Sequence, residues 1–182
     1  MTVAFVVNNS NAEASDKGTF DRIDPVTGKV ATTAAAAKAA DAAIVAKAAG
    51  AAFPAWAATG PGERRALLNK AADIMDAKSD AFIATMIAET GATGPWAGFN
   101  VMLAAGGIRE AAAMTTQIGG EVIPSNKPGT LAMGIATPKG ACLGIAPWNA
   151  PVILGARALA MPLACGNTVS LKGSEACPKT HR

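Results

Sequence analysis

Apolar positions recur at helical spacing through the middle of the chain, and this pattern predicts a series of helices. After Glu63, apolar residues return every three or four positions, among them Leu67 and Ile74, as on one face of a helix. An earlier alanine-rich segment has high helix propensity and is expected to stop near Gly50, and Pro54 is expected to interrupt the short segment AAFPAW after it. Helices are therefore expected over residues 33–50, 51–56, 63–78, 79–89 and 95–117.

Short runs of β-branched and apolar residues predict strands at both ends of the chain. In the turn DPVTG, Pro25 presets φ and Gly28 is free to take a positive φ. The segment GGEVIPSNKPG, residues 119–129, is expected to be a loop because of its glycine and proline content. Strands are expected over residues 2–7, over two parts of 130–149 that are separated at 137–140, and over 167–172.

The segment GIAPWNAPVILGARALAMPLACGNTVSLKGSE, residues 144–175, predicts a strand, a sharp turn, a helix and a second strand. Pro151 occupies a first-turn position, where a missing N–H costs no helical hydrogen bond. Gly166 stands where a left-handed residue ends a helix, and the β-branched run NTVSLK follows it. The predicted fold class is therefore α/β: a helical layer with edge strands, followed by one β-α-β unit.

Composition and charge exclude several classes of protein. The chain has 182 residues, of which 51% are hydrophobic, and a net charge of +3 from scattered basic residues, which is no footprint for nucleic acid. Three cysteines without a CxxC pair, and a single histidine, argue against a disulfide framework and against a zinc site, and suit the cytoplasm. The longest apolar segment, residues 150–165, contains Arg157 and two prolines and is too short to span a bilayer, so no membrane partner is expected.

The ends of the two predicted strands carry the candidate chemistry. In a β-α-β unit, ligands bind at the carboxyl ends of the strands, where PWN ends the first strand and KGSE the second. Glu175 has the position at which an acidic residue binds ribose hydroxyls, and Lys172 could reach the same ribose or a phosphate. The usual GxGxxG is absent, so these residues alone are a weak signal for a dinucleotide site.

The motifs APWNAP, PLACGNTV and LKGSE, at matching spacing, resemble the aldehyde dehydrogenase superfamily, which oxidises aldehydes to acids with NAD(P). The upstream segments DPVTGKV, AAFPAWAATGPGERRALLNKAADIM and ETGAT are similar to the N-terminal region of that family. TGATGPWAGFNV and TTQIGGEVIPS look most like its salicylaldehyde and vanillin dehydrogenase branch. The resemblance covers essentially the whole chain and implies the N-terminal part of the aldehyde dehydrogenase fold, with an incomplete Rossmann-like cofactor domain.

The resemblance implies roles for particular residues. Asn149 matches the residue whose amide donates a hydrogen bond to the aldehyde oxygen as negative charge develops there. Gly173 departs from the usual Pro or Ala, which is expected to loosen the loop. Trp96 and Arg157 are candidates for the substrate pocket, and no metal ligands are expected. The cofactor-binding residues implied are Ile145, Ala146, Pro147, Trp148, Lys172, Ser174 and Glu175.

Each of these residues also has a structural interpretation. Asn149 could cap the helix that begins at Pro151, since Asn is a favoured N-cap. Trp148 is expected to pack in the core, with its backbone serving the cofactor. Lys172 and Glu175 could form a solvated pair of little energetic value.

The remaining alternatives concern isolated residues. Trp96 could be a buried anchor rather than a pocket wall. Arg157 is expected either to have a structural partner or to meet a polar group of an aryl aldehyde. Cys165 is expected to be a small buried hydrophobe, and His181 an exposed tail residue.

The resemblance further implies that this chain is a fragment of a longer enzyme. The glycine motif under the pyrophosphate, the general-base Glu and the nucleophilic Cys follow later in the family, so the isolated chain is expected to be inactive. The cofactor is expected to be NAD or NADP: Glu175 favours NAD by repelling a 2′-phosphate, whereas Lys172 favours NADP by attracting one.

The full-length enzyme is expected to be a homo-oligomer. The alternative is a non-catalytic remnant that binds nucleotide weakly or associates with full-length subunits. The expected organisation is an N-terminal portion over 1–129, strands resembling the oligomerisation segment over 130–143, and the truncated cofactor unit over 144–182.

Overall fold

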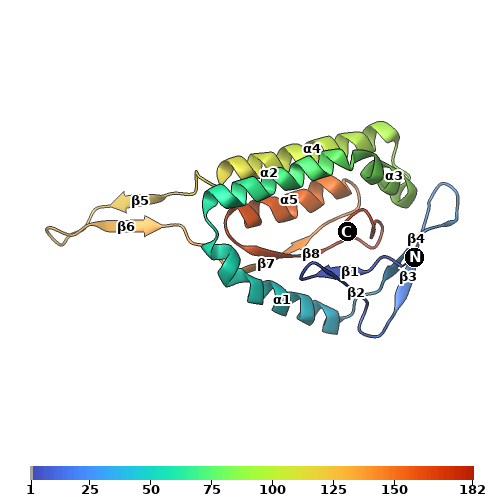
Figure 1. The fold of residues 1–182 in the computed structure, drawn as a ribbon, viewed down its shortest axis with the longest axis horizontal. Helices are drawn as coiled ribbons and strands as arrows, with labels where there is room; N and C mark the ends of the chain where they lie inside the picture. Colours follow the sequence, from blue (N-terminus) through green and yellow to red (C-terminus); the bar gives the residue numbers. More distant parts are fainter. Residues whose placement is uncertain (1) are drawn as a thin grey trace.

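A computed structural model describes residues 2–182 and shows an α/β arrangement of five helices and eight short strands (Figure 1). No helix within these residues has both the length and the apolar character needed to cross a membrane. The elements in chain order are β1 (Phe5–Val7), β2 (Ser10–Ala12), β3 (Thr19–Ile23), β4 (Val30–Ala35), α1 (Ala39–Ala58), α2 (Pro61–Ala77), α3 (Ser79–Thr90), α4 (Gly94–Met114), β5 (Gly120–Ile123), β6 (Ala132–Ile135), β7 (Ala141–Ile145), α5 (Pro151–Ala164) and β8 (Thr168–Lys172).

The predicted β-α-β unit is present as β7, α5 and β8. The two strands are parallel, with Ile145 in register with Lys172 at their carboxyl ends. Helix α5 covers one face of this pair and α1 contacts the other, so the strands are enclosed between helices (Figure 1). Parallel strands are typically covered on both faces in this way, which explains the apolar run through the unit.

The hydrophobic core lies where α2 and α4 pack on α5. Alanine dominates this core, and its small side chain lets helices approach closely with little loss of side-chain entropy. The members of the core cluster are Leu68, Ala72, Met86, Ala97, Ala104, Ala105, Ile108, Ala111, Ala112, Val152, Ala156, Ala160 and Ala164.

The carboxyl end of α5 is fastened to the helical layer by side-chain donors. Trp56 Nε1 donates to the carbonyl of Leu163 at 3.1 Å, and Arg64 Nε donates to the carbonyl of Ala164 at 3.1 Å. The last carbonyls of a helix lack the usual partner four residues later, and the two side-chain donors bind here beside the backbone N–H of Gly166, which also donates to Leu163. The orientation of α5, and of the turn that precedes it, therefore depends on α1 and α2.

The helix predicted over 33–50 is wrong at both ends. Residues Val30–Ala35 form strand β4, which pairs antiparallel with β3, and the helix begins only at Ala39. The β-branched residues before Ala34 suit a strand, and their pairing with β3 overrides the helix propensity of the following alanines. The turn between these strands is confirmed, with Gly28 at φ +69°.

The predicted stop at Gly50 and the break at Pro54 are also wrong, because α1 runs through both. A proline within a helix removes one N–H and crowds the carbonyl four residues earlier, here that of Gly50. Packing of α1 against β7 and β8 outweighs this local cost. The other helices agree with the predicted ranges to within about three residues, as is usual for helix boundaries.

Two strand predictions also need correction. The first strand is shorter than residues 2–7: Phe5–Val7 pairs with β2, and Val3 makes an isolated bridge to Ala34. The predicted loop 119–129 contains β5, which pairs with β6 in an exposed hairpin that projects from the body (Figure 1). The break at 137–140 is confirmed, and it separates β6, in this hairpin, from β7, in the sheet with β8.

The C-terminal segment folds back onto α3 through one buried carboxylate. Glu89 is 0% exposed. Its Oε1 accepts a hydrogen bond from Lys179 N at 2.9 Å, and its Oε2 accepts from Thr180 N at 2.9 Å and from Thr180 Oγ1 at 2.7 Å. The backbone carbonyl of the same residue accepts from Arg22 Nε at 2.7 Å. Glu89 thus ties β3, α3 and the chain end together.

We expect Glu89→Gln to lower the free energy of unfolding by about 1–3 kcal/mol, because an amide NH2 would face a backbone donor and leave both unpaired. Glu110→Gln, on the exposed face of α4, is the matched control and should change stability by less than about 0.5 kcal/mol. Urea denaturation of the three proteins measures the difference. Equal stability of the Glu89 and Glu110 variants would contradict the anchoring role.

Candidate functional site

The two predicted site segments meet at one edge of the parallel pair. Ile145 and Lys172 are paired at the ends of β7 and β8, and Ala146 N donates to the carbonyl of Lys172 at 3.0 Å. This bond extends the ladder one residue beyond β7 and sets the start of the PWN turn beside the start of KGSE. The carboxyl ends of parallel strands are where α/β proteins bind ligands.

The segment that follows β7 presents an open surface. Ile145, Pro147 and Trp148 are exposed and only Ala146 is buried. The Trp148 side chain is 58% exposed, so the prediction that it packs in the core of this chain is wrong. Exposed apolar side chains of this kind are suited to line a flat aromatic ligand.

Asn149 lies in the turn before α5 and is exposed. The N-cap of α5 is Ala150, and no side chain caps this helix end. The capping role that position alone made equally plausible for Asn149 is therefore not realised. Its amide makes no hydrogen bond within residues 2–182, which leaves both N–H groups available to a ligand.

The structure brings Trp96 to Asn149, although the two are far apart in sequence. Trp96 Nε1 donates to the carbonyl of Asn149 at 3.3 Å, and its ring stacks on Phe99 with centroids 5.6 Å apart. Trp96 is 42% exposed, so it is not a buried anchor of this chain. Phe99, which the sequence reasoning missed, is recognisable only by its spacing from Trp96 on α4.

Arg157 lies on the exposed face of α5. It makes no ion pair and no hydrogen bond with residues 2–182, so the expected structural partner is not found in the described chain. Its guanidinium is free to meet a ligand or another part of a longer protein.

Lys172 and Glu175 form an ion pair, with 3.2 Å between Nζ and Oε2. The pKa of Glu175 is lowered, first by its own backbone N–H and then by the hydrogen bond from Lys172. The carboxylate therefore stays ionised at neutral pH and can accept hydrogen bonds from hydroxyl groups. Because both side chains are largely exposed, the pair itself adds little stability.

Ser174 is buried between these two residues, and its backbone is bound to His181. Ser174 N donates to His181 Nδ1 at 3.1 Å, and Ser174 Oγ accepts from Ala176 N at 3.2 Å. His181 Nε2 lies 3.1 Å from the carbonyl of Pro151. The expectation of an exposed tail residue at His181 is therefore wrong: it is half-buried between the KGSE segment and α5.

The glycine at position 173 is explained by the close approach of the His181 side chain and not by loop flexibility. A Cβ added to Gly173 would lie 2.9 Å from His181 Cβ, and one added to Gly155 would lie 3.2 Å from His181 Cδ2. Neither glycine has a positive φ. The departure at position 173 was thus the one sequence signal that could have pointed to His181.

The cysteine nearest the candidate site, Cys177, is not activated. Cys177 is buried, and burial, reinforced by the nearby Glu89 carboxylate, raises the pKa of its thiol to about 12. Cys142 lies in β7 and Cys165 at the end of α5, and both are partly buried. Cys165 was expected to be a small buried hydrophobe, and the structure buries it only in part. A nucleophile must be a thiolate, and Cys177 remains a thiol at neutral pH.

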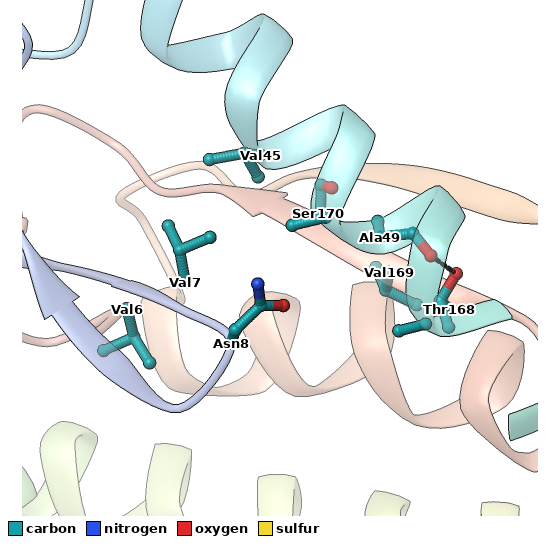
Figure 2. Close-up of a pocket in the computed structure, with 10 residues that line it drawn as sticks. Val6, Val7, Asn8, Val45, Ala49, Thr168, Val169 and Ser170 are labelled. Atoms are coloured by element: carbon teal, nitrogen blue, oxygen red, sulfur yellow. Dashed lines mark hydrogen bonds between the residues drawn. The ribbon is translucent and has the colours of Figure 1, made fainter. Parts of the chain in front are cut away.

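A small cavity of about 170 Å³ lies elsewhere, between the β1–β2 hairpin, α1 and β8 (Figure 2). Val7 and Asn8 face Val45 and Ser170 across it, and Thr168 Oγ1 donates to the carbonyl of Ala49 at 2.7 Å. No candidate site residue lines this cavity. It borders the edge of β8 that has no partner strand within residues 2–182.

The sequence matches the model of the aldehyde dehydrogenase family over residues 12–181. The chain belongs to the aldehyde dehydrogenase family. It is 59% identical over 180 residues to a vanillin dehydrogenase from Pseudomonas sp. strain HR199, covering 99% of this chain and 37% of that protein.

Solved structures of the family have the same fold. The salicylaldehyde dehydrogenase from Pseudomonas putida G7 in complex with salicylaldehyde superimposes with a TM-score of 0.97 at 49% identity, covering 100% of this chain and 37% of that one. An NAD-dependent benzaldehyde dehydrogenase from Corynebacterium glutamicum gives a TM-score of 0.92 at 30% identity, covering 97% and 38%. The chain therefore spans a little more than a third of the length of these aldehyde dehydrogenases.

The structure assigns no stabilising contact to the Asn149 side chain, and the free energy of unfolding tests this. We expect Asn149→Ala to change the free energy of unfolding by less than about 0.5 kcal/mol. The matched variant Asn167→Ala should cost at least about 2 kcal/mol. The reason is that Asn167 is buried and its side chain binds Lys139 N, Gly140 N and the carbonyl of Pro162. Denaturant melts of both variants measure this, and a cost for Asn149→Ala as large as a lost helix cap, about 1 kcal/mol, would contradict the structure.

The stability of the chain should depend on pH through His181, its only histidine. Burial lowers the pKa of His181 below 6.5. The unfolded chain then binds the proton more readily, so stability is complete above about pH 6.5 and falls as the pH drops toward the folded pKa. Unfolding measured between about pH 7 and pH 5 should show this loss in the parent and not in His181→Phe. A parent whose stability rises on acidification in that window would contradict it.

Proposed function

We propose that residues 1–182 form the amino-terminal part of the cofactor site of an NAD(P)-dependent aromatic aldehyde dehydrogenase. The observation that carries the proposal is the meeting of the PWN turn and the KGSE segment at paired strand ends, set by Ile145 and Lys172. The names of the relatives, which are vanillin, salicylaldehyde and benzaldehyde dehydrogenases, support an aryl aldehyde as the substrate and its carboxylic acid as the product.

The residues at this edge fit a dinucleotide. The ionised Glu175 carboxylate provides acceptors for ribose hydroxyls, and Lys172 provides a cation beside it. Ile145, Pro147 and Trp148 are exposed and provide an apolar wall for the nicotinamide. The bound cofactor supplies the acceptor for the hydride that leaves the substrate carbon.

The choice between NAD and NADP rests on the same ion pair. An ionised Glu175 repels a 2′-phosphate, and its bond to Lys172 uses the cation that would otherwise attract one. We therefore favour NAD.

Asn149 stabilises the negative charge that develops on the aldehyde oxygen when a nucleophile adds to the carbonyl carbon. Its amide N–H groups are free and exposed, and its backbone is held by Trp96. A donor whose backbone is fixed before the reaction needs less reorganisation when the charge appears. Trp96 and Phe99 form an aromatic surface beside this turn, and Arg157 is a free cation for a polar group on the ring of the substrate.

The projecting β5–β6 hairpin is the part of the chain suited to another subunit. It exposes a continuous set of large apolar side chains, which are Val122, Leu131, Met133 and Ile135. Exposed patches of this kind mark association sites, and we place the contact of a homo-oligomeric full-length enzyme here. The three free cysteines suit a cytoplasmic enzyme.

The isolated 182-residue chain should not oxidise aldehydes. Covalent catalysis needs a thiolate and a base in reach, and the thiol of Cys177 is buried and protonated. Spectrophotometry with salicylaldehyde or vanillin and NAD should show no NADH formation above the rate without protein. A rate proportional to the amount of purified chain would overturn the expectation and would also exclude the alternative of a non-catalytic remnant.

The role of Asn149 can be tested in a full-length enzyme made by joining residues 1–182 to the part of the strain HR199 vanillin dehydrogenase that this chain does not match. We expect Asn149→Ala to lower turnover by about a hundredfold and to change NAD affinity little. Asn149→Asp should be at least as damaging, because a carboxylate would lie beside the forming negative charge. Near-normal turnover of the Asp variant would refute the assignment of Asn149 as the donor to the aldehyde oxygen. An inactive fusion enzyme without substitutions would count against the proposed function itself.

A further inference from the structure

His181 joins the two halves of the candidate site through the two nitrogens of one imidazole. Nδ1 is 3.1 Å from Ser174 N, in the segment that carries Lys172 and Glu175. Nε2 is 3.1 Å from the carbonyl of Pro151, in the first turn of α5 directly after the PWN turn. No other side chain within residues 2–182 hydrogen-bonds to both of these segments.

The partners determine which nitrogen carries the proton. A backbone N–H can only donate, so Nδ1 must accept from Ser174 and be unprotonated. A carbonyl can only accept, so Nε2 must carry the hydrogen that is donated to Pro151. The thiol of Cys177, 3.5 Å from Nδ1, also faces the accepting nitrogen. The bridge therefore requires the neutral imidazole with its hydrogen on Nε2.

The surroundings hold the ring in this place. Gly173 and Gly155 face this side chain from the two segments that it joins: a Cβ on Gly173 would lie 2.9 Å from His181 Cβ and 3.3 Å from the ring, and one on Gly155 would lie 3.2 Å from ring atom Cδ2. The residue before it, Thr180, is fixed by the buried Glu89 carboxylate through two hydrogen bonds. The ring is thus packed on both sides and anchored at its own backbone.

We propose that His181 is a positioning residue that fixes the KGSE segment relative to the PWN turn, and so fixes the cofactor-binding pair relative to Asn149. This inference rests on the proposed function. One end of a dinucleotide would be held at Glu175 and the reacting carbonyl at Asn149, so the distance between these segments sets the alignment of the reaction. A misplacement of about 1 Å in such an arrangement can cost about a hundredfold in rate.

The test compares two variants in the full-length fusion described above. His181→Phe keeps the ring shape and loses both hydrogen bonds, whereas His181→Asn retains an acceptor at the position of Nδ1. We expect His181→Phe to weaken NAD binding, measured by calorimetry, by about five- to tenfold, the effect of losing the hydrogen bond that positions Ser174 in the KGSE segment. Its turnover should fall by a larger factor than its affinity. The Asn variant keeps the acceptor for Ser174 N, so it should bind NAD within about twofold of the parent, whereas its turnover should fall because the bond to the carbonyl of Pro151 is lost.

Thr180→Val is the matched control. It removes the 2.7 Å hydrogen bond from Thr180 Oγ1 to Glu89 and loosens the same turn without touching the imidazole. We expect a lower melting temperature with unchanged NAD affinity. If Thr180→Val weakens NAD binding as much as His181→Phe, or if His181→Asn is as weak as Phe, the effect is general loosening and the proposal fails.

Hydrogen–deuterium exchange separates this proposal from the proposed function. In the chain itself, amides of residues 173–176 should exchange about tenfold faster in His181→Phe than in the parent, since the acceptor of Ser174 N is lost. Unchanged exchange together with unchanged affinity would overturn the proposal. A parent fusion that binds neither NAD nor NADP would refute the proposed function, and the exchange rates would then decide the link between the two segments by themselves.

Discussion

The arrangement of the candidate site depends on one buried carboxylate, Glu89, near the end of α3. Its two oxygens accept three hydrogen bonds from the last turn of the chain, and its own carbonyl accepts one from Arg22. A buried carboxylate without such donors would be strongly unfavourable, so this turn is required to fold back onto the helix. The fold-back in turn brings His181 to the ends of β8 and α5.

A second constraint acts at the opposite end of α5. Trp56 and Arg64 donate hydrogen bonds to carbonyls in the last turn of α5. The alanine-rich core lets α2 and α4 pack closely along this helix. The helix is thus held at its carboxyl end by the helical layer and at its amino end by the imidazole bonded to Pro151. The PWN turn, which connects β7 to this helix, has its position set from both directions, and its exposed side chains are left for a ligand.

The exposed groups of the site are available to a ligand, whereas the buried groups behind it stabilise the fold. Trp148, Asn149 and Glu175 face solvent and contribute little to the stability of this chain. Glu89 and Ser174 are buried, and His181 is half-buried, with polar atoms satisfied by the protein. The site therefore combines ligand-facing groups that the fold does not need with supporting groups that it does. This division explains why Asn149 can be free of a capping role while its backbone is still held by Trp96.

The sequence by itself determined the β-α-β unit, most helix boundaries and the family, because helical spacing, turn residues and the PWN and KGSE motifs are local signals. Local signals misassigned residues 33–38 and Pro54, where pairing with β3 and packing on β8 outweigh propensity. Only the tertiary structure decided that Trp96 meets Asn149, that Arg157 has no partner within residues 2–182, and that His181 is half-buried. The first and the last of these facts depend on contacts between residues 53, 91 and 30 positions apart in the chain, which are Trp96 with Asn149, Glu89 with Thr180 and Pro151 with His181. No local pattern in the sequence records such contacts.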